Sequence, residues 1–277
     1  MKIVNGYDLI KYAQKKKLLL PAFNTTNMEM TYAIAKGLDR AGLPGYIQIS
    51  SNNLRLSNPQ MIVELTRDAL RNVEVPIALH LDHGTSFEDV KACVDAGFTS
   101  IMIDASKYPF EENVKIVSQA VEYCHFYGVP VEAEIGALQG KEDDNVNEAD
   151  CKTDPEEARA FAEATGCDTL AVSVGNVHGL DIEPRIDLPL LKKISEVVSV
   201  PLVLHGGSGV PFEVIRQAKQ YHLIKVNYGA DLRKAYISTF GEAYESNHNA
   251  HDVISLSMQS VVNVSDRANY LVQTINQ

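Results

Sequence analysis

Short apolar runs alternate with longer amphipathic segments along almost the whole chain. The short runs predict buried strands, because Pro or Gly bounds them, as Pro76 and Gly84 bound the run 75–81. Eight strands are predicted in this way, over residues 18–23, 44–50, 75–81, 99–104, 129–136, 170–174, 202–205 and 222–227. The amphipathic segments predict helices over 6–14, 28–41, 59–71, 87–96, 111–127 and 155–165, and from about 188, 212, 231 and 253. Residues 138–153, which are acidic and rich in Asn, are expected to form a long polar loop.

The alternation of strands and helices, in units of about 30 residues, predicts an α/β protein with a closed (β/α)8 TIM barrel and extra N- and C-terminal helices. Val75-Pro76, Val129-Pro130 and Val200-Pro201 support a repeat, since each opens a strand after a helix. A doubly wound open sheet is the alternative. That fold requires a Gly-x-Gly-x-x-Gly turn after the first strand, where this chain has Phe23-Asn24-Thr25-Thr26. Without a linker or a low-complexity segment, residues 1–277 are expected to form a single barrel domain.

Composition excludes some classes of partner. The 277 residues include 25 Lys and Arg against 36 Asp and Glu, and the net charge of −11 argues against binding to nucleic acid or to an anionic membrane surface. No apolar run approaches the length of a membrane span. The cysteines are widely spaced and contain no Cys-x-x-Cys pair, which favours reduced thiols in a cytoplasmic protein; they are Cys93, Cys124, Cys151 and Cys167.

Three predicted strands end in the dipeptide His-Gly, at His83, His178 and His205. For an isolated Asp-His pair, the simpler interpretation is a hydrogen-bonded core histidine beside an Asp that caps the next helix. Three such ends favour a shared site, because all strand ends of a barrel meet at one face. Three histidines are also the number with which a catalytic Zn²⁺ keeps one coordination position open. One catalytic Zn²⁺ is therefore predicted at these histidines.

Other polar side chains end the predicted strands at the same face: Asn24, Ser50, Asp82, Asp104, Glu134 and Asn227. Asp82 is adjacent to the predicted ligand His83. Depending on where its side chain points, it either supports that metal ligand or exchanges protons with a substrate. Asp104 and Glu134 are interpreted as hydrogen-bond partners of the histidines or as ligands of an alternative, second metal position. Salt bridges within a polar barrel mouth explain these two carboxylates equally well.

A glycine-rich turn follows the third histidine. Gly206-Gly207-Ser208-Gly209 precedes a predicted helix, so its backbone N–H groups and the helix N-terminus are suited to an anion. The turn belongs to the seventh strand-to-helix loop, where barrels commonly bind phosphate. Asn227, at the end of the eighth predicted strand, is expected to complete this phosphate pocket.

These residues resemble the class II, metal-dependent ketose-bisphosphate aldolases of the fructose- and tagatose-bisphosphate type. The motifs that carry the resemblance cover roughly the first 230 residues in order: Ala22-Phe23-Asn24, Asp82-His83-Gly84-Thr85-Ser86-Phe87, Thr99-Ser100-Ile101-Met102-Ile103-Asp104, Val131-Glu132-Ala133-Glu134-Ile135-Gly136, Gly175-Asn176-Val177-His178-Gly179, His205-Gly206-Gly207-Ser208-Gly209 and Lys225-Val226-Asn227. The resemblance implies reversible cleavage of a ketose phosphate or bisphosphate into a dihydroxyacetone-phosphate-type donor and an aldehyde. It further implies that a zinc ion, acting as a Lewis acid, stabilises the charge of the enediolate formed in this reaction.

The resemblance also implies roles for individual residues. The implied zinc ligands are His83, His178 and His205. Asp82 is the implied acid/base, and Glu142 stands where the family places a mobile glutamate that handles a proton at carbon. The implied substrate and phosphate contacts are Asn24, Ser50, Gly179, Gly206, Gly207, Ser208, Asn227, Gly229 and Ala230. Some members of the family bind a monovalent cation near the residues that correspond to Gly179 and Ser208.

A phosphorylated sugar substrate and a homodimer or homotetramer are expected on the same grounds. The implied mechanism needs no lysine Schiff base, and Lys225 is interpreted as structural or as a charge partner. A barrel metallohydrolase is a competing hypothesis, but that class commonly has a His-x-His pair on its first strand, and the run 18–23 has no histidine.

The chain departs from the family pattern at the phosphate site. Ala230 stands three residues after Asn227, where the family usually has a Ser or Thr that binds phosphate. Asn52-Asn53 replaces small residues, and the segment 247–251 lacks an Arg that members with two-phosphate substrates often supply from a neighbouring subunit. These departures keep two alternatives open: an aldolase for a non-standard sugar phosphate, and a non-catalytic aldolase-like subunit. The retained histidines and Asp82 speak against the second alternative.

Overall fold

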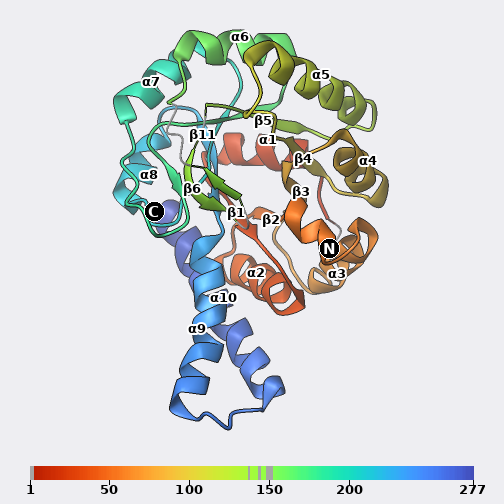
Figure 1. Cartoon of the computed structure of the whole chain (residues 1–277), viewed down its shortest axis with the longest axis vertical. Helices are drawn as coiled ribbons and strands as arrows, with labels where there is room; N and C mark the ends of the chain where they lie inside the picture. The colour runs from red at the N-terminus through yellow and green to blue at the C-terminus, as the bar shows by residue number, and fades with distance from the viewer. Residues whose placement is uncertain (1–2, 137, 143–144, 148–151) are drawn as a thin grey trace.

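The computed structural model describes residues 3–136, 138–142, 145–147 and 152–277. Eight of its strands are β1 (Leu20–Asn24), β2 (Gly45–Ser50), β3 (Ile77–Gly84), β4 (Ser100–Ile103), β5 (Val131–Ile135), β8 (Thr169–Val172), β10 (Leu202–Leu204) and β11 (Leu223–Tyr228). They close into a barrel in the order β1-β11-β10-β8-β5-β4-β3-β2, and every neighbouring pair is parallel (Figure 1). The predicted (β/α)8 barrel is confirmed.

Helices surround the barrel and connect its strands (Figure 1). They are α1 (Gly6–Lys16), α2 (Met28–Ala41), α3 (Pro59–Ala69), α4 (Phe87–Ala96), α5 (Phe110–Phe126), α6 (Pro155–Thr165), α7 (Leu188–Val197), α8 (Phe212–Ala218), α9 (Ala230–Ser246) and α10 (Val253–Ile275), with a short 3-10 helix η1 (Ser51–Arg55). Local sequence sets their ends: the Asn27 side chain accepts from Met30 N at the start of α2, and Gly42 ends that helix at a φ of 66°. The extra helices predicted at both ends of the chain are α1 and α10.

The segment 138–153 was expected to be a loop, and that expectation was wrong for part of it. β6 (Gln139–Glu142) and β7 (Asn145–Asn147) form an antiparallel pair, and β6 also pairs in parallel with β9 (Val177–His178). Gly140 lets the two backbones approach, because a Cβ at this residue would lie 2.2 Å from the His178 carbonyl oxygen. This small sheet is built by backbone pairing of polar residues, so the hydrophobic pattern gave no sign of it.

His178 also lies elsewhere than predicted, because β8 ends at Val172 and does not extend to the histidine. Gly175, with a φ of 93°, turns the chain out of the barrel wall. Asn176 then holds the turn: its side chain accepts from Val174 N at 2.8 Å and donates to the His205 carbonyl at 3.1 Å. This turn carries His178 back over the barrel mouth, where it lies in β9.

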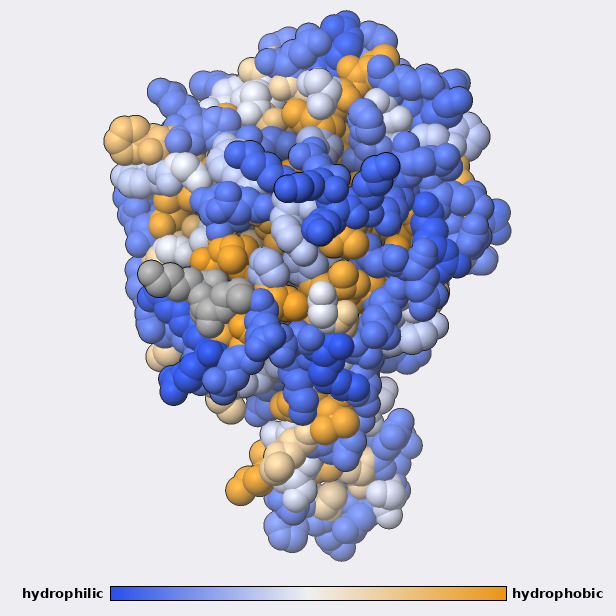
Figure 2. Space-filling view, turned by 180° about the vertical axis from the view of Figure 1, so that it is seen from behind, coloured by the Kyte–Doolittle hydropathy of each residue, from blue (hydrophilic) through white to orange (hydrophobic). Residues whose placement is uncertain are grey.

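The C-terminal helices pack on the barrel and extend beyond it. α10 lies against α2 and α9, and the outer parts of α9 and α10 project from the barrel (Figure 1). Exposed large apolar or aromatic side chains of α9 and α10 include Ile237, Tyr244, Val253, Ile254, Met258 and Val262. Figure 2 shows some orange atoms on the projection among polar ones. Among the described residues, no helix is long and apolar enough to cross a membrane.

The contact between α2 and α10 generates a stability prediction. A Cβ on Gly37 would lie 2.7 Å from Ala268 Cβ and 2.8 Å from the Ser265 carbonyl oxygen. Gly37→Ala should therefore lower the free energy of unfolding by about 1–3 kcal/mol, because the two helices must separate. Gly241→Ala is the matched control: no atom lies within 4 Å of its added methyl group, and it should stabilise α9 by about 0.5–1 kcal/mol. Urea denaturation checks both values, and equal effects of the two changes would contradict the close-packing explanation.

Candidate active site

The three predicted metal-binding histidines lie together at the carboxyl end of the barrel. His83 is in β3, His178 is in β9, and His205 directly follows β10. The ring centroids of His83 and His205 are 4.7 Å apart, those of His83 and His178 are 5.5 Å apart, and those of His178 and His205 are 6.2 Å apart. One ring nitrogen from each histidine lies within 4.8 Å of the other two, an arrangement suited to a metal ion.

A β-bulge in β3 places the adjacent Asp82 and His83 in the same site. The pairing with β4 shifts between Leu81 and Gly84, so that one extra residue is accommodated on β3. His83 adopts a φ of 47°, in the left-handed region that few residues other than Gly occupy. The bulge interrupts the alternation of side chains along the strand, and both polar side chains can therefore serve the barrel mouth.

Two carboxylates fix the orientation of two of the histidines. His83 Nδ1 donates to Asp104 Oδ2 at 2.7 Å, and His205 Nε2 donates to Glu132 Oε1 at 2.9 Å. Once these nitrogens are protonated, the nitrogen suited to a metal is Nε2 of His83 and Nδ1 of His205. Metal-binding histidines in proteins almost always donate their second ring N–H to such a partner. The donor set therefore fits a metal ion, and all-imidazole ligation favours Zn²⁺.

The charges around the histidines also favour a bound cation. Burial alone would lower the pKa of His205, but hydrogen bonds to Glu132 and Glu134 raise it to about 9. Burial would raise the pKa of Asp104, but hydrogen bonds from His83 and Ser106 hold it well below its usual range. Carboxylates that remain ionised around the His205 ring attract positive charge to this position, whether a proton or a metal ion.

Glu134 lies on the metal side of His205, with its Oε2 3.0 Å from His205 Nδ1. Together with His83 and Asp104 it forms a second group whose candidate ligand atoms lie within 4.8 Å of one another. The two predicted carboxylates are thus both at the cluster. Asp104 orients His83, and the second group has the composition expected of the alternative metal position.

Asp82 is fully buried and lies beside the histidines. Its carboxylate accepts hydrogen bonds from Asn24 Nδ2 at 2.7 Å, Gln48 Nε2 at 3.0 Å and Asn227 Nδ2 at 3.1 Å. Ser50, another predicted residue, pairs with Asp82 in the register of β2 and β3. Amide side chains from three strands thus hold the carboxylate in one orientation.

Sequence reasoning missed the roles of Gln48 and Glu132. Gln48 lies in the middle of the apolar run 44–50, and a polar residue in a buried strand is the signal that could have identified it. Glu132 precedes Glu134 by two residues, so the two side chains point to the same side of β5. Lys225 forms a buried ion pair with Glu132, which confirms its interpretation as a charge partner.

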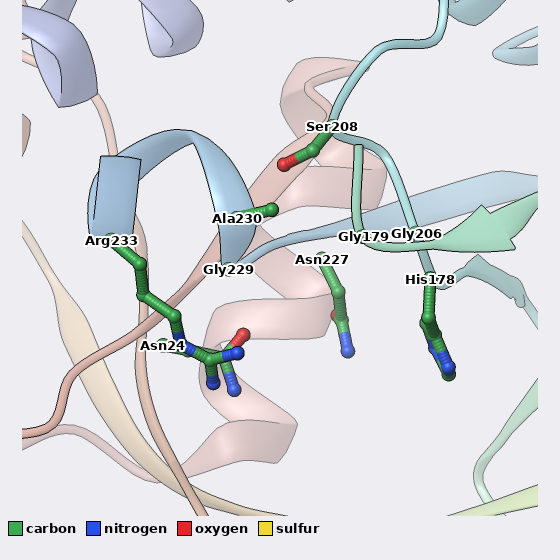
Figure 3. A pocket seen from close by; sticks show the side chains of 9 residues that line it. All are labelled: Asn24, His178, Gly179, Gly206, Ser208, Asn227, Gly229, Ala230 and Arg233. Atoms are coloured by element: carbon green, nitrogen blue, oxygen red, sulfur yellow. The ribbon is translucent and has the colours of Figure 1, made fainter. Parts of the chain in front are cut away.

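A pocket next to His178 brings together most of the residues predicted to contact substrate and phosphate (Figure 3). Its lining comprises Asn24, His178, Gly179, Gly206, Ser208, Asn227, Gly229, Ala230 and Arg233. Gly206 has a φ of 61°, and a Cβ there would lie 2.0 Å from the Val177 carbonyl oxygen, so this position requires Gly. Arg233 was not predicted; it lies one turn into α9 from Ala230, and Figure 3 shows it reaching toward Asn24.

Of the residues predicted to contact substrate and phosphate, Ser50 and Gly207 are not part of this lining. Gly207 donates its N–H to the Asn227 carbonyl at 2.9 Å, and a Cβ there would lie 2.5 Å from Val226 Cγ1. Gly207 therefore supports the packing of the loop against β11. Glu142 ends β6, and its side chain lies outside the described residues.

The sequence matches the family described as "Fructose-bisphosphate aldolase class-II" over residues 4–277. It is 39% identical over 256 residues to a fructose-bisphosphate aldolase of Geobacillus stearothermophilus, covering 91% of this chain and 89% of the relative. A Staphylococcus epidermidis protein of the same name is 37% identical over 256 residues, which cover 91% of this chain and 90% of the relative. Among solved structures, the chain resembles the YdjI aldolase of Escherichia coli K12, with a TM-score of 0.84, 28% identity and coverage of 99% and 97%. A Coccidioides immitis structure, provisionally named a fructose-1,6-biphosphate aldolase, has a TM-score of 0.88 at 28% identity, with coverage of 98% and 96%.

Proposed function

The chain belongs to the class II fructose-bisphosphate aldolase family and is a metal-dependent aldolase, and we propose that its metal is one Zn²⁺ held by His83, His178 and His205. The observation that carries this proposal is the convergence of three histidines, two of which donate their outer nitrogens to carboxylates. When bound, the ion supplies Lewis-acid stabilisation of the negative charge that develops as the carbon–carbon bond breaks. The relatives are named for fructose bisphosphate, so a ketose bisphosphate is the first substrate to consider.

Asp82 is the proposed acid/base. In the cleavage direction its carboxylate takes the proton from the substrate hydroxyl next to the breaking bond, and in the reverse direction it returns that proton to the aldehyde oxygen. Hydrogen bonds from the amides of Asn24, Gln48 and Asn227 restrict rotation of the carboxylate and keep it oriented toward the substrate. Glu142 is proposed to handle the proton at carbon; in support, its strand β6 pairs with the strand that contains His178.

The pocket lined by Ser208, Gly229 and Arg233 is proposed to bind a phosphate group of the substrate. Ser208 is buried and accepts from Asp231 N at 3.1 Å, which fixes its hydroxyl at the start of α9. Ala230 offers no hydroxyl, so Arg233 is proposed to replace that contact with its guanidinium, a charged and bidentate donor. The alternative of a non-standard sugar phosphate rests on this substitution.

We also propose that the protein is a cytoplasmic homo-oligomer, a homodimer or homotetramer. The exposed apolar side chains on the projecting part of α9 and α10 form a surface that a second copy would cover (Figure 2). The buried free thiols of Cys93, Cys124 and Cys167 support a reducing compartment.

The zinc site is tested first by metal removal. Chelation should abolish aldol cleavage of a ketose bisphosphate and added Zn²⁺ should restore it, because the ligands are uncharged imidazoles that the chelator outcompetes. His178→Ala should lose most of its zinc, as measured by elemental analysis of the purified protein. Borohydride, which reduces a lysine Schiff base to a stable covalent adduct, should leave the enzyme active and unlabelled when it is added with substrate. Full zinc occupancy in His178→Ala would rule out the ligand set.

The role of Asp82 is separable from metal binding. Asp82→Ala should retain zinc but lose about 10²–10⁴-fold in kcat, the usual contribution of general acid/base catalysis. Zinc content and single-turnover cleavage, measured on the same preparation, check the prediction. A loss of zinc that parallels the loss of activity would instead assign Asp82 to metal binding.

The phosphate pocket predicts opposite effects at two positions. Arg233→Gln should raise KM for a ketose bisphosphate about 10–100-fold, the value of one charge-assisted hydrogen bond, while Ala230→Ser should lower KM by adding a donor. Lys234→Gln is the matched control, because Lys234 is an exposed neighbour with the same charge and lies outside the pocket lining. Steady-state kinetics on all three variants provide the test. If KM responds equally to Arg233→Gln and Lys234→Gln, the guanidinium does not bind phosphate.

A further inference from the structure

His205 is one end of a buried chain of polar contacts that crosses the barrel interior. Its Nε2 donates to Glu132 Oε1, and the Lys225 ammonium donates to Glu132 Oε1 at 3.0 Å and to Oε2 at 2.9 Å. Glu132 and Lys225 are only 3% and 2% exposed, so solvent screens neither charge. Lys225 comes from β11, and Glu132 comes from β5 on the other side of β10 and β8. The contacts therefore bridge strands that are not hydrogen-bonded to each other.

The function of this chain of contacts follows from the chemistry of imidazole. His205 can bind a metal through Nδ1 only if the ring proton is on Nε2, and an acceptor placed at Nε2 selects that tautomer. Glu132 is such an acceptor, but a buried carboxylate without a cation is costly and would turn toward water or another donor. Lys225 compensates the charge and contacts both carboxylate oxygens, which keeps Glu132 beneath the histidine ring.

The remaining contacts of Lys225 indicate that its ammonium has no direct contact with the substrate pocket. Its Nζ lies 3.5 Å from His80 Nε2 and 5.7 Å from the centre of the Tyr46 ring. His80 Nδ1 in turn contacts Ser100 Oγ at 2.7 Å. These groups lie deeper in the barrel than the three histidines, and Lys225 is absent from the pocket lining. Of the described lysines and arginines, Lys225 alone is buried.

We propose that Lys225 is a positioning residue: through Glu132 it fixes the ring orientation and tautomer of His205, and it thereby sets the affinity of the site for its metal ion. The inference rests on the proposed function, in which His205 is a zinc ligand. In this proposal Lys225 influences metal binding indirectly, through Glu132 and His205, and takes no part in covalent chemistry with the substrate.

The test compares Lys225→Met, the double variant Lys225→Met with Glu132→Gln, and Ser100→Ala. The Zn²⁺ affinity of each folded protein is measured by competition with a chromophoric chelator, and the nitrogen chemical shifts of His205 report its tautomer. Lys225→Met should bind Zn²⁺ at least about tenfold more weakly, because supporting residues around metal ligands contribute about 10–100-fold. The double variant should recover most of this loss, since a Gln oxygen still accepts from Nε2 and needs no cation.

Ser100→Ala is the matched control. It removes a contact on the opposite side of Lys225 through His80 and leaves Glu132 untouched, so its Zn²⁺ affinity should equal that of the wild type. Wild-type affinity in folded Lys225→Met, an equal loss in Ser100→Ala, or no recovery in the double variant would overturn the inference.

If Lys225→Met does not fold, the charge-neutral double variant decides the question. Near-wild-type affinity with the proton on Nε2 supports positioning by the Lys–Glu pair, and folded protein with weak binding contradicts it. Failure of the zinc site itself is distinguishable, since the wild type would then bind no Zn²⁺ or would bind it no better than His178→Ala.

Discussion

The barrel mouth is organised by the need to provide buried carboxylates with hydrogen-bond donors. Asp82, Glu132 and Glu134 are almost fully inaccessible, and Asp104 is only partly exposed. Three of these carboxylates accept from donors on other segments: amides for Asp82, His83 for Asp104, and His205 Nε2 for Glu132. Glu134 instead lies beside His205 Nδ1, the nitrogen suited to a metal. Against these four negative charges the described interior provides one lysine, Lys225. A divalent cation at the proposed site between the histidines would reduce this surplus, which is consistent with the metal dependence of the family.

The bulge in β3 shows how a regular barrel accommodates this set of charges. Along an ideal strand, Asp82 and His83 would point to opposite sides, with one in the barrel and the other against the helices. The extra residue and the left-handed backbone at His83 allow Asp82 to meet Asn24, Gln48 and Asn227 while His83 meets Asp104 on β4. Such backbone conformations cost about 1–3 kcal/mol and persist where the surrounding structure over-determines them. Here the hydrogen bonds on both residues provide that constraint.

The hydrophobic pattern predicted the barrel because its strands are buried on both faces and read as continuous apolar runs. It also predicted which residues end the strands, and therefore the group of His83, His205, Asp82 and Asn227. It could not place His178, whose position depends on the turn at Gly175 and on the backbone pairing of β9 with β6. The pattern indicated that Lys225 is structural or a charge partner, but it could not identify Glu132 as that partner, because the pairing depends on how distant strands are arranged in the barrel.

The departure at Ala230 and the presence of Arg233 have one physical explanation. A hydroxyl at the first residue of α9 would be a short donor fixed beside the helix N-terminus, and it would define the anion position closely. A guanidinium one turn further along the helix reaches the same pocket on a longer side chain and contributes a full positive charge. If the pocket binds phosphate as proposed, this exchange would keep the attraction for the phosphate but relax the demand on its exact location. In the proposed function the histidines and Asp82 carry the chemistry and lie outside this exchange, so a change in substrate range would require no change in the reaction.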